Sequence, residues 1–185
     1  MILSLSGYAG AGKDTFAAFL IQDFGFKRYA FADTLRTALE ILDPGVVAWG
    51  QYTSLRRLVR TYGWEVVKRD HPEVRKMLQV LGTEVGRELL GEDIWVEATF
   101  KKIKAEGAER VVITDCRFPN ELAWVKVSKG SSVWIDRPGT GAVNGHSSES
   151  ALAGIDFDYT FINDAQSLTE MRQRVSEFVV TNLGI

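Results

Sequence analysis

The stretch that decides the fold is Met1-Ile-Leu-Ser-Leu-Ser-Gly-Tyr-Ala-Gly-Ala-Gly-Lys-Asp-Thr15. Residues 2–6 predict a short buried strand, and the apolar residues 16–21 predict a helix. Between them lies the pattern Gly7-x-x-x-x-Gly12-Lys13. Glycines between a strand and a helix let backbone N–H groups turn inward around an anion, and the helix N-terminus adds its positive end. The stretch therefore predicts a phosphate-binding loop.

The residue types in this loop suit a nucleotide donor. The Lys13 ammonium is the charge that reaches the outer phosphates. Asp14 stands where such loops usually have serine or threonine, and Thr15 follows it. We expect Thr15 to contact phosphate and Asp14 to hold Mg²⁺, directly or through water. The alternative is a glycine-rich turn that binds nothing. The predicted ATP-binding residues are Gly7, Ala9, Gly10, Ala11, Gly12, Lys13, Asp14 and Thr15.

Composition argues against several classes of protein. A chain of 185 residues suits one domain with a small inserted part. Its net charge of −2 argues against an electrostatic nucleic-acid binder. No apolar run approaches the roughly 18 residues that a membrane span needs. The single cysteine, Cys116, excludes an internal disulfide, and no secretory signal pattern precedes the first strand. We therefore expect a cytoplasmic protein without nucleic-acid or membrane partners.

A second strand is expected over residues 26–31, followed by a helix over residues 34–42 with Asp33 as its N-cap. This places Asp33 and Arg36 just past the carboxyl end of a parallel strand, where open α/β sheets bind their ligands. The guanidinium fork of Arg36 matches the oxygens of a phosphate group. The alternative is that Arg36 is a solvated helix residue.

The middle of the chain predicts an inserted helical part. Residues 43–52 are expected to be a loop, and Ser54 can cap a helix that runs to about residue 70. A second helix is expected over residues 72–91, with proline in its first turn. A third, over residues 94–106, follows. Several helices between two strands suggest a subdomain inserted into an α/β core.

The helix expected over residues 72–91 contains Gly82 and Gly86, four residues apart on one face. Because each glycine costs about 1 kcal/mol relative to alanine inside a helix, they suggest that another helix or a ligand packs closely there. Arg75, Gln79 and Arg87 lie nearer this face and can bind a ligand. Aromatic residues suited to a nucleotide base are Tyr62, Trp64 and Trp95, with a core role favoured for the two tryptophans.

A further buried strand is expected over residues 110–115 and ends in Asp115. Parallel strands present their carboxyl ends at one edge of the sheet, so Asp115 is expected beside the phosphate-binding loop. A carboxylate in that place holds Mg²⁺ in many nucleotide-binding proteins. Arg117 emerges at the same edge. A helix over residues 119–128 and a strand over residues 132–136 then follow.

Residues 137–146 are rich in glycine and polar residues and follow the fourth expected strand. A kinase needs an element that excludes water from the transferring phosphoryl group, and this stretch is a candidate lid. The alternative is an ordinary surface loop. A strand over residues 159–163 and a helix over residues 168–183 complete the chain. The alternation predicts an α/β three-layer sandwich with a five-stranded parallel sheet and an inserted helical subdomain.

Several short motifs occur in a fixed order along nearly the whole chain. They are Gly7-Tyr-Ala-Gly-Ala-Gly-Lys-Asp-Thr15, Phe31-Ala-Asp-Thr-Leu-Arg36, Leu78-Gln-Val-Leu-Gly-Thr-Glu84 with Arg87, Glu92-Asp-Ile-Trp95, Thr114-Asp-Cys-Arg-Phe-Pro-Asn-Glu121 and His146-Ser-Ser-Glu149. In this order the chain resembles the bacteriophage deoxynucleoside monophosphate kinases. Only the first motif is specific by itself, so the resemblance rests on the combination.

The resemblance implies a P-loop kinase that uses Mg²⁺ and transfers the γ-phosphoryl group of ATP to deoxynucleoside monophosphates. It implies a core over residues 1–32, 107–136 and 151–185, a monophosphate-binding part over 33–106 and a lid over 137–150. A homodimer is left open. The catalytic residues implied are Lys13, Arg117, Arg137 and Asp115. Asp14 and Asp115 are implied as metal ligands. The monophosphate-binding residues implied are Asp33, Arg36, Arg75, Gln79, Arg87, Trp95 and Glu149.

Three alternatives remain at this stage. The first is another small-molecule kinase with the same fold, such as a phosphomevalonate, gluconate or dephospho-coenzyme A kinase. The second is a P-loop switch or ATP-binding assembly protein, although such switches usually have Gly-Lys-Ser/Thr. The third, nucleic-acid binding, lacks support in the net charge of −2.

Overall fold

The structure is a computed structural model in which residues 1–141, 151–152 and 154–185 are described. The chain divides into two compact units. The first, here called the core unit, comprises Met1–Ala30 and Phe100–Ile185. The second, the helical unit, comprises Phe31–Thr99.

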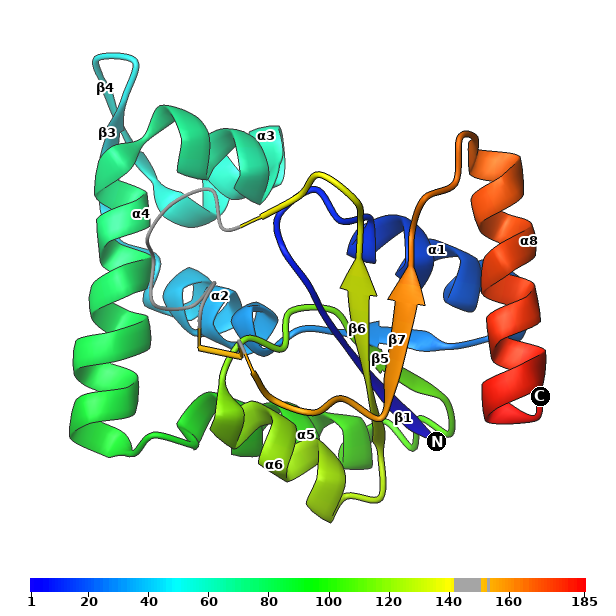
Figure 1. Cartoon of the computed structure of the whole chain (residues 1–185). Helices are drawn as coiled ribbons and strands as arrows, with labels where there is room; N and C mark the ends of the chain where they lie inside the picture. Colours follow the sequence, from blue (N-terminus) through cyan, green and yellow to red (C-terminus); the bar gives the residue numbers. More distant parts are fainter. Residues whose placement is uncertain (142–150, 153) are drawn as a thin grey trace. The chain divides into compact units, whose positions relative to one another are not determined.

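The core unit is built on a five-stranded parallel sheet in the order β2-β5-β1-β6-β7 (Figure 1). Leu3 and Leu5 of the central strand are fully buried, as expected for a parallel strand that is covered on both faces. The predicted α/β fold with five parallel strands is confirmed. The strands are β1 (Ile2–Ser6), β2 (Lys27–Tyr29), β5 (Val111–Ile113), β6 (Ser131–Asp136) and β7 (Tyr159–Ile162).

Helices cover both sides of this sheet: Figure 1 shows α1 and α8 on one side and α5 and α6 on the other. Phe16 of α1 meets Phe161 of β7 and Phe178 of α8, with ring centroids 4.9 Å and 5.6 Å apart. This apolar packing anchors the helix that follows the phosphate-binding loop. The helices are α1 (Lys13–Phe24), α5 (Ile94–Ala105), α6 (Pro119–Val127) and α8 (Leu168–Phe178), which continues as a π-helix over Val179–Leu183.

The helical unit has an apolar core of its own, in which Leu55, Val67 and Val74 are fully buried. The predicted cap at Ser54 is confirmed, since its side chain accepts a hydrogen bond from the Arg57 backbone N–H at 3.2 Å. The elements are α2 (Phe31–Leu42), β3 (Gly45–Ala48), β4 (Gln51–Ser54), α3 (Leu55–Asp70), α4 (Pro72–Gln79), the π-helical segment η1 (Val80–Leu90) and the first part of α5.

The loop expected over residues 43–52 was wrong, because most of it forms the antiparallel hairpin β3–β4. Val46 and Ala48 are buried whereas Val47 is exposed, which is the alternation of a strand. The two turn residues, Trp49 and Gly50, have φ angles of 49° and 80°. Two-residue hairpin turns require such positive angles, and Asn-Gly is the pair that usually signals them. Because tryptophan occupies the first turn position, the usual sequence signal for this turn is absent.

The helix expected over residues 72–91 is α-helical for its first eight residues and π-helical after Gln79. A Cβ atom would lie 2.9 Å from Leu35 if placed on Gly82, and 2.5 Å from the indole nitrogen of Trp95 if placed on Gly86. Both glycines therefore permit close packing by side chains of the same unit. The sequence left open whether a helix or a ligand packs against these glycines, and in the structure side chains of neighbouring helices do so.

The N-cap expected at Asp33 was also wrong. Helix α2 begins at Phe31, so that Asp33 lies inside the first turn. A carboxylate there still complements the positive end of the helix dipole. Phe31 is apolar and 3% exposed, and it is the first residue of this helix instead of the last residue of the preceding strand.

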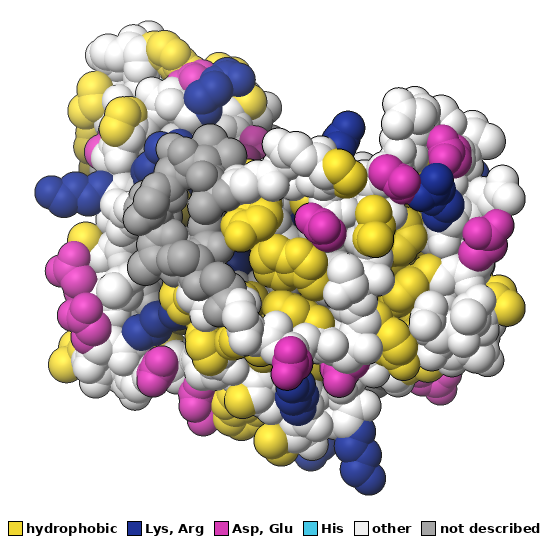
Figure 2. All heavy atoms as spheres, viewed as in Figure 1, with side chains coloured by type: hydrophobic (Ala, Val, Ile, Leu, Met, Phe, Trp, Pro, Cys, Tyr) yellow, Lys and Arg dark blue, Asp and Glu magenta, His cyan; other side chains and the backbone are white. Residues whose placement is uncertain are grey.

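Two findings bear on possible macromolecular partners. Within the described part of the chain, no helix is both long and apolar enough to cross a bilayer. On the face seen in Figure 2, Lys and Arg side chains are interspersed with Asp and Glu among the described residues, and no broad basic patch is visible there.

Candidate active site

The phosphate-binding loop folds tightly against the carboxyl edge of the sheet because two of its glycines leave no room for a side chain. Gly7 has a φ of +143°, and a Cβ atom on it would lie 2.3 Å from the Ile135 carbonyl oxygen of β6. Gly12 has a φ of +98°, and its Cβ would lie 2.5 Å from the amide nitrogen of Asn163. Both positions therefore require glycine for backbone conformation and for space.

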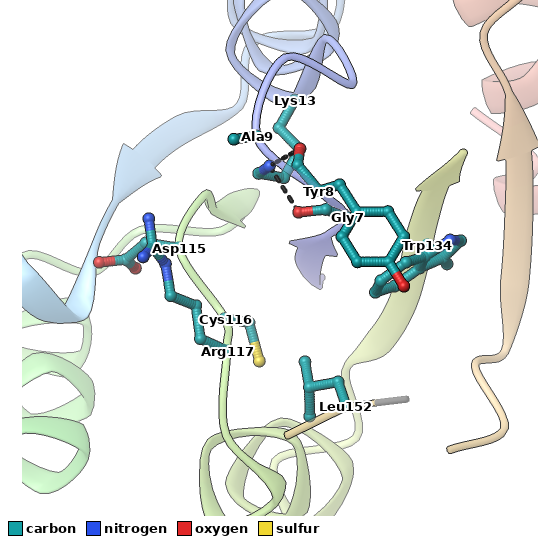
Figure 3. A pocket seen from close by; sticks show the side chains of 9 residues that line it. All are labelled: Gly7, Tyr8, Ala9, Lys13, Asp115, Cys116, Arg117, Trp134 and Leu152. Atoms are coloured by element: carbon teal, nitrogen blue, oxygen red, sulfur yellow. Dashed lines mark hydrogen bonds between the residues drawn. The ribbon is translucent and has the colours of Figure 1, made fainter. Parts of the chain in front are cut away.

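Lys13, the first residue of α1, lies across the first half of this loop (Figure 3). Its Nζ donates hydrogen bonds to the carbonyl oxygens of Gly7 and Tyr8, both at 2.7 Å. A fixed ammonium at a helix N-terminus adds to the positive end of the helix dipole. The arrangement is suited to binding a phosphate anion.

Asn163 holds the loop from the carboxyl end of β7, and the sequence analysis did not single it out. Its side chain is 5% exposed, and Nδ2 donates to the Ala11 carbonyl oxygen at 2.8 Å. The signal available in the sequence was a polar residue directly after an expected strand. Asn163 therefore positions the loop backbone next to Gly12.

We expect Asn163→Ala to weaken nucleotide binding and to lower the free energy of unfolding by about 1–3 kcal/mol, because a buried carbonyl loses its donor. Calorimetric titration with ADP and urea unfolding would measure both effects. The control for ADP affinity is Asn182→Ala, which removes the side-chain hydrogen bond of an exposed residue to the Phe178 carbonyl in α8. Equal ADP affinity in the two variants would contradict this role for Asn163.

Asp115 and Arg117 follow β5 and line the same pocket as Lys13 (Figure 3). The Ser6 hydroxyl at the end of β1 donates to the Cys116 carbonyl oxygen at 2.9 Å, which ties this segment to the start of the phosphate-binding loop. Three of the predicted catalytic residues are thus brought together, while their individual roles stay predictions. The pocket is lined by Gly7, Tyr8, Ala9, Lys13, Asp115, Cys116, Arg117, Trp134 and Leu152.

Glu121 is a second residue that the sequence analysis missed as a site residue. It is 2% exposed in the first turn of α6, where its Oε2 accepts the backbone N–H groups of Arg117 at 2.6 Å and of Phe118 at 3.0 Å. A carboxylate at a helix N-terminus is favoured by the dipole. Glu121 therefore orders the backbone that presents Arg117, as a glutamate three residues into a helix often does.

Cys116 lines the pocket but is not suited to nucleophilic chemistry. Burial raises the pKa of its thiol well above the usual value, and the negative charge of Glu121 raises it further. The thiol is therefore protonated at neutral pH, and the thiolate is the reactive form of cysteine. This argues against covalent catalysis by cysteine in the pocket.

Arg137 follows β6 and lies at the exposed side of the phosphate-binding loop. Its Nη1 donates to the Gly10 carbonyl oxygen at 3.4 Å, a long hydrogen bond. Most of the lid expected over residues 137–150 lies outside the described residues, as does Glu149. The roles predicted for Arg137 as a catalytic residue and for Glu149 in monophosphate binding stay predictions.

The other residues predicted to bind the monophosphate belong to the helical unit. Arg36 makes two long ion pairs, at 3.4 Å to Asp33 and 3.5 Å to Glu65. The indole N–H of Trp95 donates to the Gly82 carbonyl oxygen at 2.9 Å, so this tryptophan has a packing role in the unit. Arg75 and Gln79 are exposed on α4, and Arg87 is half-buried in η1. Their part in monophosphate binding stays a prediction.

The pocket contains a donor suited to Mg²⁺. Mg²⁺ prefers oxygen ligands, keeps several waters and is usually held by one or two carboxylates together with substrate phosphates. Asp115 lines the same pocket as Lys13, whereas Asp14 is exposed at the start of α1 and is not among the lining residues. Across residues 1–141, 151–152 and 154–185, no three His, Cys, Asp or Glu side chains gather as a cage. The donor set fits a phosphate-bound Mg²⁺ better than a protein-enclosed ion.

The comparison with protein families decides the class of enzyme. Residues 51–175 match the family model described as deoxynucleotide monophosphate kinase. The chain belongs to this family. The resemblance found in the sequence is thereby confirmed, and the protein is a nucleotide kinase, which is a phosphotransferase. The matched range contains much of the helical unit together with Asp115 and Arg117.

Two viral relatives of this deoxynucleotide monophosphate kinase family protein have names of the same kind. The chain is 29% identical to the putative deoxynucleotide monophosphate kinase of Acanthamoeba polyphaga mimivirus, over 89% of each protein. It is 51% identical over 47 residues to the deoxynucleoside-5′-monophosphate kinase of Escherichia phage T5, a match that covers 25% of this chain and 19% of that protein. Among solved structures, the shikimate kinase of Bacteroides thetaiotaomicron is similar over 100% of this chain and 99% of its own, with a TM-score of 0.49 and 13% identity.

Proposed function

We propose that the protein transfers the γ-phosphoryl group of ATP to deoxynucleoside monophosphates and releases deoxynucleoside diphosphates. The observation that supports this most directly is the pocket in which Lys13, Asp115 and Arg117 lie beside the first half of the phosphate-binding loop. Membership of the deoxynucleotide monophosphate kinase family supports the same class of acceptor.

The proposed reaction requires the protein mainly to position the substrates and to stabilise the charge on their phosphates. The loop N–H groups and Lys13 bind the donor phosphates, and the guanidinium of Arg117 stabilises the charge on the transferring group. The acceptor phosphate is already an anionic nucleophile, so no strong general base is needed. Mg²⁺, when bound, neutralises charge on the donor phosphates, with Asp115 and Asp14 as its proposed ligands. Catalysis is therefore alignment together with electrostatic stabilisation.

The helical unit is proposed to bind the acceptor monophosphate. Arg36 is proposed as one cation that binds this phosphate, because its ion pairs with Asp33 and Glu65 are long and partly exposed. Such pairs contribute little free energy, so a phosphate group can replace them at low cost. A planar guanidinium can then bind two phosphate oxygens at once.

The proposed function is tested by following ADP release from ATP and Mg²⁺ with a panel of acceptors. The panel contains dAMP, dGMP, dCMP, dTMP and the four ribonucleoside monophosphates, with phosphomevalonate, gluconate and dephospho-coenzyme A as other kinase substrates. We expect turnover with at least one deoxynucleotide and weaker turnover with the matching ribonucleotide. Turnover with ribonucleotides alone, or with one of the other substrates alone, would overturn the proposed acceptor while leaving a kinase.

A further inference from the structure

The pocket beside Lys13 has two walls of different chemistry. One wall has the charged groups of Lys13, Asp115 and Arg117. The other is aromatic: the rings of Tyr8 and Trp134 meet edge to face, with centroids 5.3 Å apart and planes at 87° (Figure 3). Edge-to-face contact is one of the geometries that aromatic side chains prefer. The occupant therefore needs an anionic end and a less polar face.

Both residues of the aromatic wall have further contacts within the core unit. The Trp134 ring also contacts Phe157, with centroids 5.2 Å apart, and Trp134 lies on β6 beside the central strand. Tyr8 is tied to the loop, since its backbone carbonyl accepts the Lys13 ammonium at 2.7 Å. The two rings are therefore placed by the sheet and by the loop, both of which are fixed parts of the core unit.

The pocket belongs to the first half of the loop. Its lining includes Gly7, Tyr8 and Ala9, whereas the second half of the loop leads into the N-terminus of α1. A helix N-terminus is where donor phosphates bind. The pocket is thus on the side of the loop that faces the ends of β5 and β6, and it is available to the second substrate.

We propose that Tyr8 and Trp134 form the wall against which the sugar of the acceptor nucleotide packs, and that this wall favours deoxyribose over ribose. This inference rests on the proposed function. The wall borders the same pocket as Arg117, which is proposed to meet the transferring phosphoryl group. The acceptor phosphate must reach that group, and the sugar of the acceptor is bonded directly to its phosphate. A 2′-hydroxyl turned toward an aromatic ring would lose its hydrogen bonds to water. An apolar wall rejects an added hydroxyl only moderately, by about 10²-fold at most.

The test compares Tyr8→Ala with Tyr8→Phe, which keeps the ring and removes only the hydroxyl. We expect Tyr8→Ala to raise the KM for the best deoxynucleotide about tenfold and to bring the deoxy-to-ribo ratio of kcat/KM closer to one. We expect Tyr8→Phe to change both values less than Tyr8→Ala does, because it keeps the ring. The affinity for ADP without acceptor, measured by calorimetry, should stay within about twofold of the parent in both variants, since the proposed wall contacts the acceptor.

Fluorescence gives a second measurement that needs no turnover. We expect the acceptor to quench the tryptophan emission of the parent protein and to quench that of Trp134→Phe much less, because an occupant of the pocket contacts this ring. Tyr8→Leu, which keeps an apolar side chain without the ring, replaces Tyr8→Ala if the latter unfolds.

Two results would overturn the inference. The first is an unchanged acceptor KM and an unchanged deoxy-to-ribo ratio in Tyr8→Ala. The second is a parallel loss of ADP affinity, which would show that the ring shapes the donor loop instead. A parent protein that phosphorylates no nucleotide would remove the proposed function itself and this inference with it, and that outcome is recognised before any variant is made.

Discussion

Lys13→Ala is expected to lower turnover by at least about 10²–10³-fold, the loss that follows removal of one preorganised electrostatic donor, equivalent to about 3–4 kcal/mol. The Lys13 ammonium is held across the loop by the carbonyl oxygens of Gly7 and Tyr8. The fold should persist, because the side chain is half-buried at the pocket and belongs to no apolar cluster of the core. ADP release and thermal unfolding would measure the two effects separately.

The control for this variant is Lys104→Ala, which removes an exposed lysine from the last turn of α5. It removes one positive charge, as Lys13→Ala does, and should leave turnover within about twofold, since surface charges contribute little. Near-normal turnover of Lys13→Ala would contradict the catalytic role of Lys13. An unfolded Lys13→Ala protein would show instead that this lysine supports the loop structurally.

Gly7→Ala is expected to cost about 3 kcal/mol or more of the free energy of unfolding. A φ of +143° is strained for any side chain, and the new Cβ would lie 2.3 Å from the Ile135 carbonyl oxygen. Because that oxygen belongs to the backbone of β6, the clash is relieved only by moving the loop or the strand. We therefore expect ADP binding to be lost together with stability, as measured by calorimetry and urea unfolding.

Gly10→Ala provides the matched control in the same loop. Gly10 also has a positive φ, of +78°, but no atom lies within 4 Å of a Cβ placed there. Only the cost of the left-handed conformation remains, about 1–2 kcal/mol. Equal destabilisation by the two substitutions would contradict the argument from the contact with Ile135.

Local patterns in the sequence predicted the elements that depend on local physics. An apolar run, several glycines and a lysine all lie within the first 24 residues. Together they predicted the strand β1, the phosphate-binding loop and helix α1. The strand that ends before Asp115 was predicted for the same reason, since a continuous apolar run is typical of a buried parallel strand. The π-helical segment η1 was not predicted, and its glycines Gly82 and Gly86 are packed by Leu35 and Trp95 from other elements.

The sequence by itself determined the class of fold and the phosphate-binding loop, because a strand–loop–helix with glycines and a lysine sets its own backbone conformation. Tertiary structure decided which distant residues complete the pocket and the loop. Strand order places β5 on one side of β1 and β6 on the other, and so brings Arg117 and Trp134 to opposite walls beside Tyr8. The same order brings Asn163 to Ala11, across 152 positions of the chain. Such neighbours depend on how strands pair, and pairing is a property of the whole sheet.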